Sequence, residues 1–204
     1  MDGDLGMNTS RMEAFSDGVI AIIITIMVFG LSSPHGFTFS ALRPLIPFFE
    51  IYALSFTYLA IYWFNHHHLL RATKRIDGRI LWANMHLLFW LSLFPFFTAW
   101  MGNSKISKDP TIVYGIALFL TAIAFLLLQK SIVKSHGNDL AAKFAGESSW
   151  KSKISPALYL SGIIFSIWWP IIGVALYALV AAIWVIPDRK LENYLSSSQL
   201  DQDL

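Results

Sequence analysis

The sequence predicts an all-α membrane protein of six transmembrane helices, with both ends of the chain in the cytosol. Hydrophobic residues make up 55% of the 204 residues and charged residues only 14%, which lies well outside the composition of soluble domains. Apolar stretches long enough to cross a bilayer recur along the chain. Lysines and arginines also gather on one side of an alternating six-span arrangement, as they do beside the cytosol.

The first predicted span covers residues 12–31, and three charges, Arg11, Glu13 and Asp17, lie at or directly before its start. The acidic segment before it, residues 1–10, lacks the basic start and the small-residue cleavage site of a signal peptide, so we expect it to remain in the mature protein. The turn "SSPHGF" separates this span from the second, which lies within residues 37–64. Polar breaks, "RATKRIDGR" and "GNSKISKDP", then bound the third span, residues 80–101.

The fourth span, residues 111–128, follows Pro110, a residue suited to the first turn of a helix. Residues 129–153 are polar or amphipathic and predict an interfacial segment, with Phe144 and Trp150 among the lysines. The last apolar stretch, residues 154–186, is too long for one helix. The run Trp168, Trp169 and Pro170 predicts its division into spans five and six. Residues 11–187 thus form the transmembrane domain, and residues 188–204 a polar cytosolic tail.

The basic residues give the orientation. In the six-span arrangement one side has only Arg43, Lys105 and Lys108. The other side holds the remaining twelve: Arg11, Arg71, Lys74, Arg75, Arg79, Lys130, Lys134, Lys143, Lys151, Lys153, Arg189 and Lys190. The positive-inside rule places the richer side, and with it both termini, in the cytosol.

Polar residues of three predicted helices share one depth near this cytosolic side. Arg11 and Asp17 open the first span; Asn65, His66, His67 and His68 end the second; Trp82, Asn84 and His86 begin the third. Hydrogen bonds between such residues are worth about 1 kcal/mol each in lipid and could fix the position of the first helix. We expect His67 or His68 to be the partner of Asp17. Capping and headgroup anchoring is the simpler alternative for these charges.

The stretch "RMEAFSDG" resembles the Arg-x-x-x-Phe-Ser-Asp motif of the transmembrane protein 175 family, the lysosomal potassium channels and their shorter bacterial relatives. The matching residues are Arg11, Phe15, Ser16 and Asp17, and "NHHH" and "NMH" follow at the expected places. The resemblance implies a potassium-permeable channel in the cell membrane, formed by a homotetramer whose central pore is lined by the first helix. The resemblance implies no cofactor. The ions expected to pass through the pore are K⁺ and other monovalent cations.

The resemblance also implies a hydrophobic constriction at Ile22, with the hydroxyl of Thr25 facing the lumen. Ile22, Thr25, Ile26 and Phe29 lie at helical spacings of three and four and therefore share one face. The helix is apolar nearly all round, so periodicity alone does not choose this face over that of Ile20, Ile23, Ile24 and Met27. Without the resemblance, the simpler interpretation is that these isoleucines pack against lipid or the protein core. The hydroxyl of Thr25 would then bond to a carbonyl of its own helix.

Other functions find less support. Three consecutive helical histidines point about 100° apart, so we expect no metal site at His66, His67 and His68. No enzyme motif appears, and the chain contains no cysteine. The balance of charge makes nucleic acid an improbable partner. A secondary transporter or proton pathway is the main alternative, since intramembrane Asp, Glu and His can relay protons, and a purely structural membrane protein is the second.

Overall fold

The computed structural model describes residues 9–73, 75–136 and 150–185. In these ranges the regular elements are helices: α1 (Thr9–Val28), the 3₁₀ helix η1 (Phe39–Leu45), α2 (Ile46–Arg71), α3 (Gly78–Ser92), α4 (Phe94–Asn103), α5 (Lys108–His136), α7 (Trp150–Phe165) and α8 (Pro170–Val185). The N-terminal segment 1–10, apart from its last two residues, and the tail 188–204 lie outside them, as does most of the expected interfacial segment.

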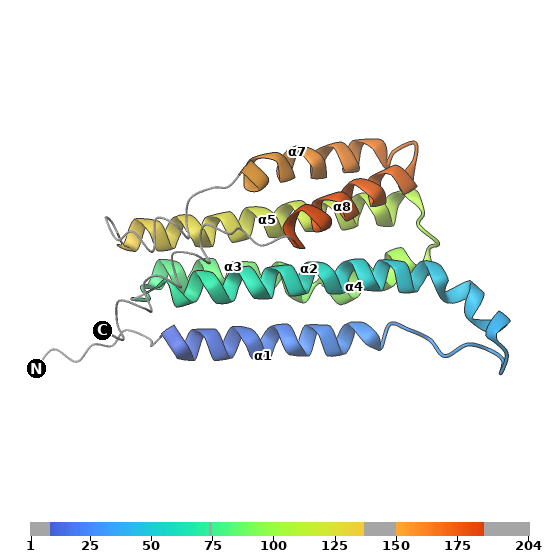
Figure 1. The fold of residues 1–204 in the computed structure, drawn as a ribbon, viewed down its shortest axis with the longest axis horizontal. Helices are drawn as coiled ribbons and strands as arrows, with labels where there is room; N and C mark the ends of the chain where they lie inside the picture. The colour runs from blue at the N-terminus through green and yellow to red at the C-terminus, as the bar shows by residue number, and fades with distance from the viewer. Residues whose placement is uncertain (1–8, 74, 137–149, 186–204) are drawn as a thin grey trace, which may run out of the picture.

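The helices lie side by side along the long axis of the molecule (Figure 1). The bundle has α1 at one edge and α7 at the other, with α2, α3 and α4 next to α1 (Figure 1). α1 packs on α2, α3 and α4, while α5, α7 and α8 pack on one another. The start of α1, the end of α2 and the start of α3 lie at the same end of the bundle (Figure 1), so α1 and α2 are antiparallel neighbours.

Helix boundaries follow the predicted spans with two differences. The predicted third span divides at Leu93 into α3 and α4, because Pro95 in the first turn of α4 lacks the amide hydrogen that a continuous helix needs. α2 begins only at Ile46 and runs on to Arg71, so the histidine run lies inside the helix rather than after it. The break predicted at Trp168–Pro170 is confirmed, since α7 ends at Phe165 and α8 begins at Pro170.

Within the described residues, three helical stretches are long and apolar enough to cross a membrane: Phe39–Arg71, Gly78–Asn103 and Lys108–His136. Pro170–Val185 is apolar but shorter. α1 has 20 residues and carries Arg11, Glu13 and Asp17 in its first half, and α7 has 16 residues. The all-helical, membrane-spanning class is therefore confirmed, whereas the count of six spans and the cytosolic location of the termini stay predictions.

Tyr177 of α8 joins neighbouring helices on the side of the bundle away from α1. The carbonyl oxygen of Tyr177 accepts a hydrogen bond from Tyr58 Oη at 2.6 Å, which joins α8 to α2. The ring of Tyr177 lies against Gly115 of α5 and Gly162 of α7, where an added Cβ would come within 2.0 Å and 2.4 Å of its atoms. These two positions therefore need glycine for close approach, not for backbone freedom.

Candidate functional site

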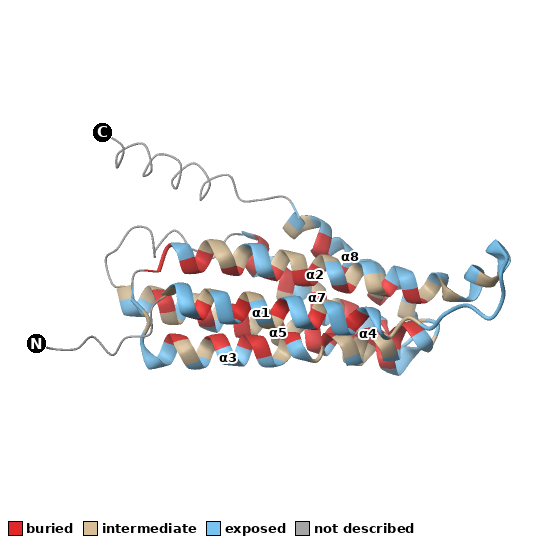
Figure 2. Cartoon of the chain, turned by 90° about the horizontal axis from the view of Figure 1, so that it is seen from below, coloured by how far each residue is buried: buried red, intermediate tan, exposed pale blue. Residues whose placement is uncertain are grey.

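α1 has two unlike faces. One face is buried against α2, α3 and α4, and in Figure 2 buried residues alternate with exposed ones along the helices of the bundle. Its buried members are Met12, Ser16, Ile20, Ile23 and Met27, at helical spacings of three and four. Ile20, Ile23 and Met27, which sequence periodicity left open as a pore face, thus lie inside the helical bundle, with Ile24 half-buried beside them.

The opposite face of α1 is apolar, and the described residues leave it uncovered. Ile22 is 60% exposed, Ile26 51% and Phe29 80%, and Thr25 is exposed beside them. The face continues toward the helix start through Phe15, which is 53% exposed, and through Gly18, whose absent Cβ would meet nothing within 4 Å. A surface of this kind needs lipid or another chain against it, because so long an apolar stripe is rare on a water-exposed monomer.

Thr25 carries the polar atom on this stripe. Its hydroxyl donates to the carbonyl oxygen of Ala21 at 2.8 Å, the common back-bond of a helical threonine. Since the hydroxyl oxygen acts only as donor in that bond, its lone pairs remain able to accept a hydrogen bond or to face a cation.

Three fully buried polar side chains join α1, α2 and α3. The Ser16 hydroxyl donates to the Met12 carbonyl at 2.8 Å, so its oxygen is left to accept from Asn84 Nδ2 at 3.0 Å. Asn84 Oδ1 then faces His66 Nε2 at 2.7 Å. Because that oxygen can only accept, His66 donates from Nε2, and in the neutral ring its Nδ1 carries no hydrogen. Within the described residues this buried Nδ1 has no hydrogen-bond partner.

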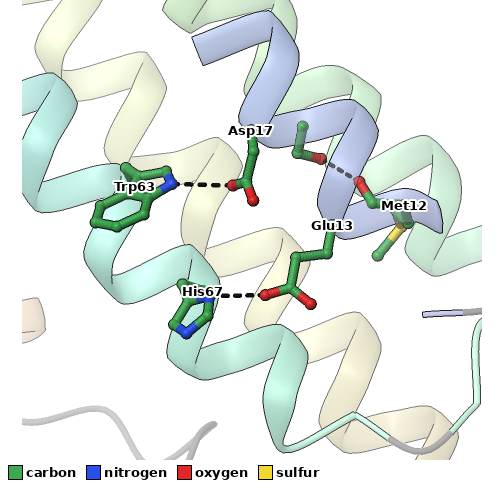
Figure 3. A network of polar contacts seen from close by, with 6 residues as sticks. Met12, Glu13, Asp17, Trp63 and His67 are labelled. Carbon is green, nitrogen blue, oxygen red and sulfur yellow. Dashed lines mark hydrogen bonds and ion pairs between the residues drawn. The ribbon is translucent and has the colours of Figure 1, made fainter. Parts of the chain in front are cut away.

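Two further contacts join α1 to α2 beside the network of Ser16, Asn84 and His66 (Figure 3). Asp17 Oδ1 accepts from Trp63 Nε1 at 2.9 Å, and Glu13 Oε1 lies 2.6 Å from His67 Nδ1. The expectation that His67 or His68 holds Asp17 is therefore wrong. Because α1 and α2 are antiparallel, the residue one turn later on α1 meets the residue one turn earlier on α2. Glu13 and Asp17 are four residues apart, and so are Trp63 and His67. This equal spacing is the sequence signal that could have predicted the two pairs.

The other residues singled out in the sequence make contacts of different kinds. Arg11 is exposed at the start of α1. The ring of His68 packs edge-on against Phe64, with centroids 4.3 Å apart. His86, an exposed residue of α3, accepts from Trp90 Nε1 at 3.0 Å within its own helix. In the described part of the chain no group of three or more His, Asp and Glu side chains could hold a metal ion.

These features define the class of the protein: an integral membrane protein built as a helical bundle, with a first helix held by buried polar contacts and apolar on its free face. The sequence profile of the endosomal/lysosomal potassium channel TMEM175 matches residues 11–95, which begin at Arg11 and include the whole buried network. The chain belongs to the TMEM175 family of potassium channels, as its relatives make plain.

A potassium channel of Chryseobacterium sp. (strain P1-3) is 47% identical over 192 residues, which cover 94% of this chain and 100% of the relative. A potassium channel of Streptomyces collinus is 32% identical over 131 residues, or 60% of this chain and 64% of the relative. The crystal structure of a lysosomal potassium-selective channel TMEM175 homologue from Chamaesiphon minutus matches with a TM-score of 0.74 and 26% identity, over 87% of this chain and 96% of that one. The potassium channel MtTMEM175 shares the fold, with a TM-score of 0.59 at 18% identity over 97% of this chain and 99% of that one.

Proposed function

We propose that this chain is one subunit of a potassium-permeable channel in the cell membrane, and that the exposed face of α1 lines its pore. The observation that carries the proposal is the uncovered apolar stripe of Ile22, Thr25, Ile26 and Phe29 on an otherwise well-packed helix. Full-length similarity to a potassium channel of Chryseobacterium supports potassium as the permeant ion.

One copy of the chain cannot enclose a pore by itself, because α1 lies at an edge of the bundle (Figure 1). Several copies of α1 around a common axis would cover the stripe and leave a lumen between them. The number four comes from the family resemblance.

In this arrangement Ile22 forms the constriction. A ring of branched apolar side chains excludes water from a narrow tube, and an ion cannot give up its hydration shell there without replacement ligands. The closed pore is therefore dry. Opening widens the ring until water enters, and the oxygens of Thr25, less than one turn further along, then offer partial replacement for water around the ion. Potassium is favoured over sodium because the larger ion costs less to dehydrate.

The buried network gives α1 a fixed support. Ser16 lies on the face opposite the stripe, so its bond to Asn84 holds the back of the helix while the front remains free. Without such support, an apolar helix at the edge of a bundle would rotate easily, since one of its faces is nearly as oily as another.

Flux into liposomes tests the proposal. The purified protein is reconstituted, and potassium, sodium and proton fluxes are measured with and without a potassium gradient. A channel gives passive potassium flux that does not saturate at low concentration, a secondary transporter gives saturable or coupled uptake, and a structural protein gives none. Mass measurement of the detergent-solubilised protein adds the oligomer size; a monomer would leave no central pore and would contradict the proposal.

A further inference from the structure

A positive charge lies at the start of the exposed face of α1. Arg11 is exposed, and it precedes Phe15 by four residues and Ile22 by eleven. Eleven residues complete three helical turns to within about 20°, so Arg11 shares the face of Ile22. At the helical rise per residue it lies about 16 Å from Ile22 along the axis. The apolar face therefore ends in a guanidinium group.

The two acids of α1 leave this charge unpaired. Glu13 and Asp17 lie two and six residues after Arg11, which places them about 160° and about 120° away from it round the helix. Both acids face α2: Glu13 Oε1 lies 2.6 Å from His67 Nδ1. Asp17 Oδ1 accepts from Trp63 Nε1 at 2.9 Å. Among the residues that the structure describes, no carboxylate forms an ion pair with Arg11.

The proposed channel gives this charge a defined place, and the inference that follows rests on that proposed function. If the copies of α1 present their exposed faces to a common axis, each subunit contributes one Arg11 to the pore mouth at which α1 begins. Exposed arginines also end α2, at Arg71, and begin α3, at Arg79, at the same end of the bundle (Figure 1). Charges of this kind are typical of the end of a helical bundle that meets water.

A ring of like charges at a pore mouth acts on ions before they reach the constriction. Arginine carries its charge at every physiological pH, and rings of arginine or lysine favour anions over cations. A ring of about four unit charges at about 10 Å from the axis lowers the local concentration of a monovalent cation about threefold in about 0.1 M salt. In about 1 M salt, screening removes most of this effect.

We propose that Arg11 limits the entry of potassium from the side of the membrane on which α1 begins. The ring of Arg11 lowers the number of cations available at its own mouth and leaves the opposite mouth unaffected. At low salt the channel therefore carries more potassium toward the α1-start side than away from it. Ile22 determines whether the pore contains water, whereas Arg11 determines how often a cation enters from one side.

The chain contains no cysteine, so a single introduced thiol lets the charge at this position be changed on the assembled channel. Arg11→Cys is recorded in planar bilayers before and after reaction with methanethiosulfonates that add an aminoethyl, an ethyl or a sulfonatoethyl group. These groups are positive, neutral and negative. In about 0.1 M KCl, the current that enters from the α1-start side should be about threefold larger in Arg11→Cys than in the unaltered chain. The positive group should reverse this gain, the neutral group should preserve it, and the negative group should increase it further.

Arg71→Cys places the same thiol at the same end of the bundle but on α2, and it is the matched control. Its current should not respond to the charge of the added group. Arg11→Lys keeps the positive charge and should conduct like the unaltered chain. In about 1 M KCl all these currents should converge, which an effect of side-chain size alone would not produce. Intact mass measurement verifies that each thiol has reacted.

Several results would overturn the proposal. They are a thiol at position 11 that does not react, equal responses to all three added groups, no response to any of them, and a difference that persists in about 1 M KCl. The proposed channel is tested separately by Ile22→Asn. If that variant alters conductance and the charge at position 11 does not, the pore remains and the role of Arg11 is wrong. Absence of potassium flux through the unaltered chain would overturn both.

Discussion

Asn84 of α3 donates a hydrogen bond to the hydroxyl oxygen of Ser16 on α1 across 3.0 Å, and both side chains are fully buried. The same asparagine meets His66 of α2, so one side chain joins three helices. Its substitution leaves two buried polar groups without partners, which costs more than the bonds themselves contribute.

Asn84→Leu is therefore expected to lower the free energy of unfolding by about 2–3 kcal/mol. Thermal unfolding in detergent, followed by circular dichroism, measures the loss. Asn103→Leu, at an exposed position near the end of α4, is the matched control and should unfold like the unaltered chain. Equal stability of the two variants would mean that the buried network does not support α1.

Ile22→Asn tests the proposed constriction. A polar side chain at the narrowest point lets water remain there, so potassium conductance should rise and the preference for potassium over sodium should fall. Single-channel recording in planar bilayers gives both quantities. Ile164→Asn on α7 is the comparison, because Ile164 is similarly exposed, at 54% against 60%, but lies far from α1. If both variants conduct like the unaltered chain, Ile22 does not line the constriction.

Gly115→Ala tests the packing of Tyr177. The new methyl group would lie 2.0 Å from Tyr177 Oη and 2.5 Å from the ring carbon that bears it, so α5 and α8 must move apart. Overpacking of this kind should cost about 1–3 kcal/mol of stability. Gly18→Ala is the control: it meets no atom within 4 Å and should be neutral or stabilising, since alanine favours helix. Similar unfolding temperatures for both variants would contradict the close fit.

Asp77 gives the fold a pH dependence outside the membrane-spanning helices. It caps α3 by accepting from the amides of Ile80 and Arg79, each at 2.9 Å, and it accepts from Ser135 of α5 at 2.8 Å. The bond from the Ile80 amide is the main cause that lowers the pKa of Asp77 below its ordinary value of 3.8, and the Ser135 hydroxyl and the Arg79 amide add to it. Because the folded-state pKa is the lower one, its stabilisation is complete above pH 3.8 and is lost as pH falls through the lowered pKa.

Asp77→Ala should therefore cost about 1 kcal/mol near neutral pH, and the difference from the unaltered chain should shrink in acid below the folded-state pKa of Asp77. Unfolding in denaturant at several pH values measures it. Asp77→Asn keeps a capping oxygen but cannot ionise, so it should retain most of the neutral-pH stability without this acid dependence. If the free energies of unfolding of Asp77→Ala and the unaltered chain differ by the same amount at all pH values, ionisation of Asp77 does not contribute to the cap.

Much of the fold could be predicted from the sequence, because apolar length and breaking residues act locally. The run Trp168–Pro170 marks the end of α7 and the start of α8 as predicted. Pro95 was read as part of one span, since a proline inside an apolar stretch can kink a membrane helix without dividing it.

The site was predicted less completely, because its details depend on how helices meet. Asn84 was expected near the start of α1 and lies there, where it contacts His66. His67 and His68 were instead expected as partners of Asp17, and neither holds it. The faces of α1 could not be told apart by periodicity, since apolar side chains surround the helix. Ser16 was the one local sign, as a polar residue in line with Met12, Ile20, Ile23 and Met27.

The two edge contacts between α1 and α2 also set the axial register of these helices. Glu13 with His67 and Asp17 with Trp63 match at a spacing of one turn. A slip by one turn, about 5.4 Å, would place Asp17 opposite Leu59, which is fully buried, and leave His67 facing the first residue of the helix. Sliding of α1 along α2 is thus a step between unlike pairings and not a smooth motion. Any movement that widens the proposed pore has to tilt or rotate α1 at constant height, or carry α2 with it.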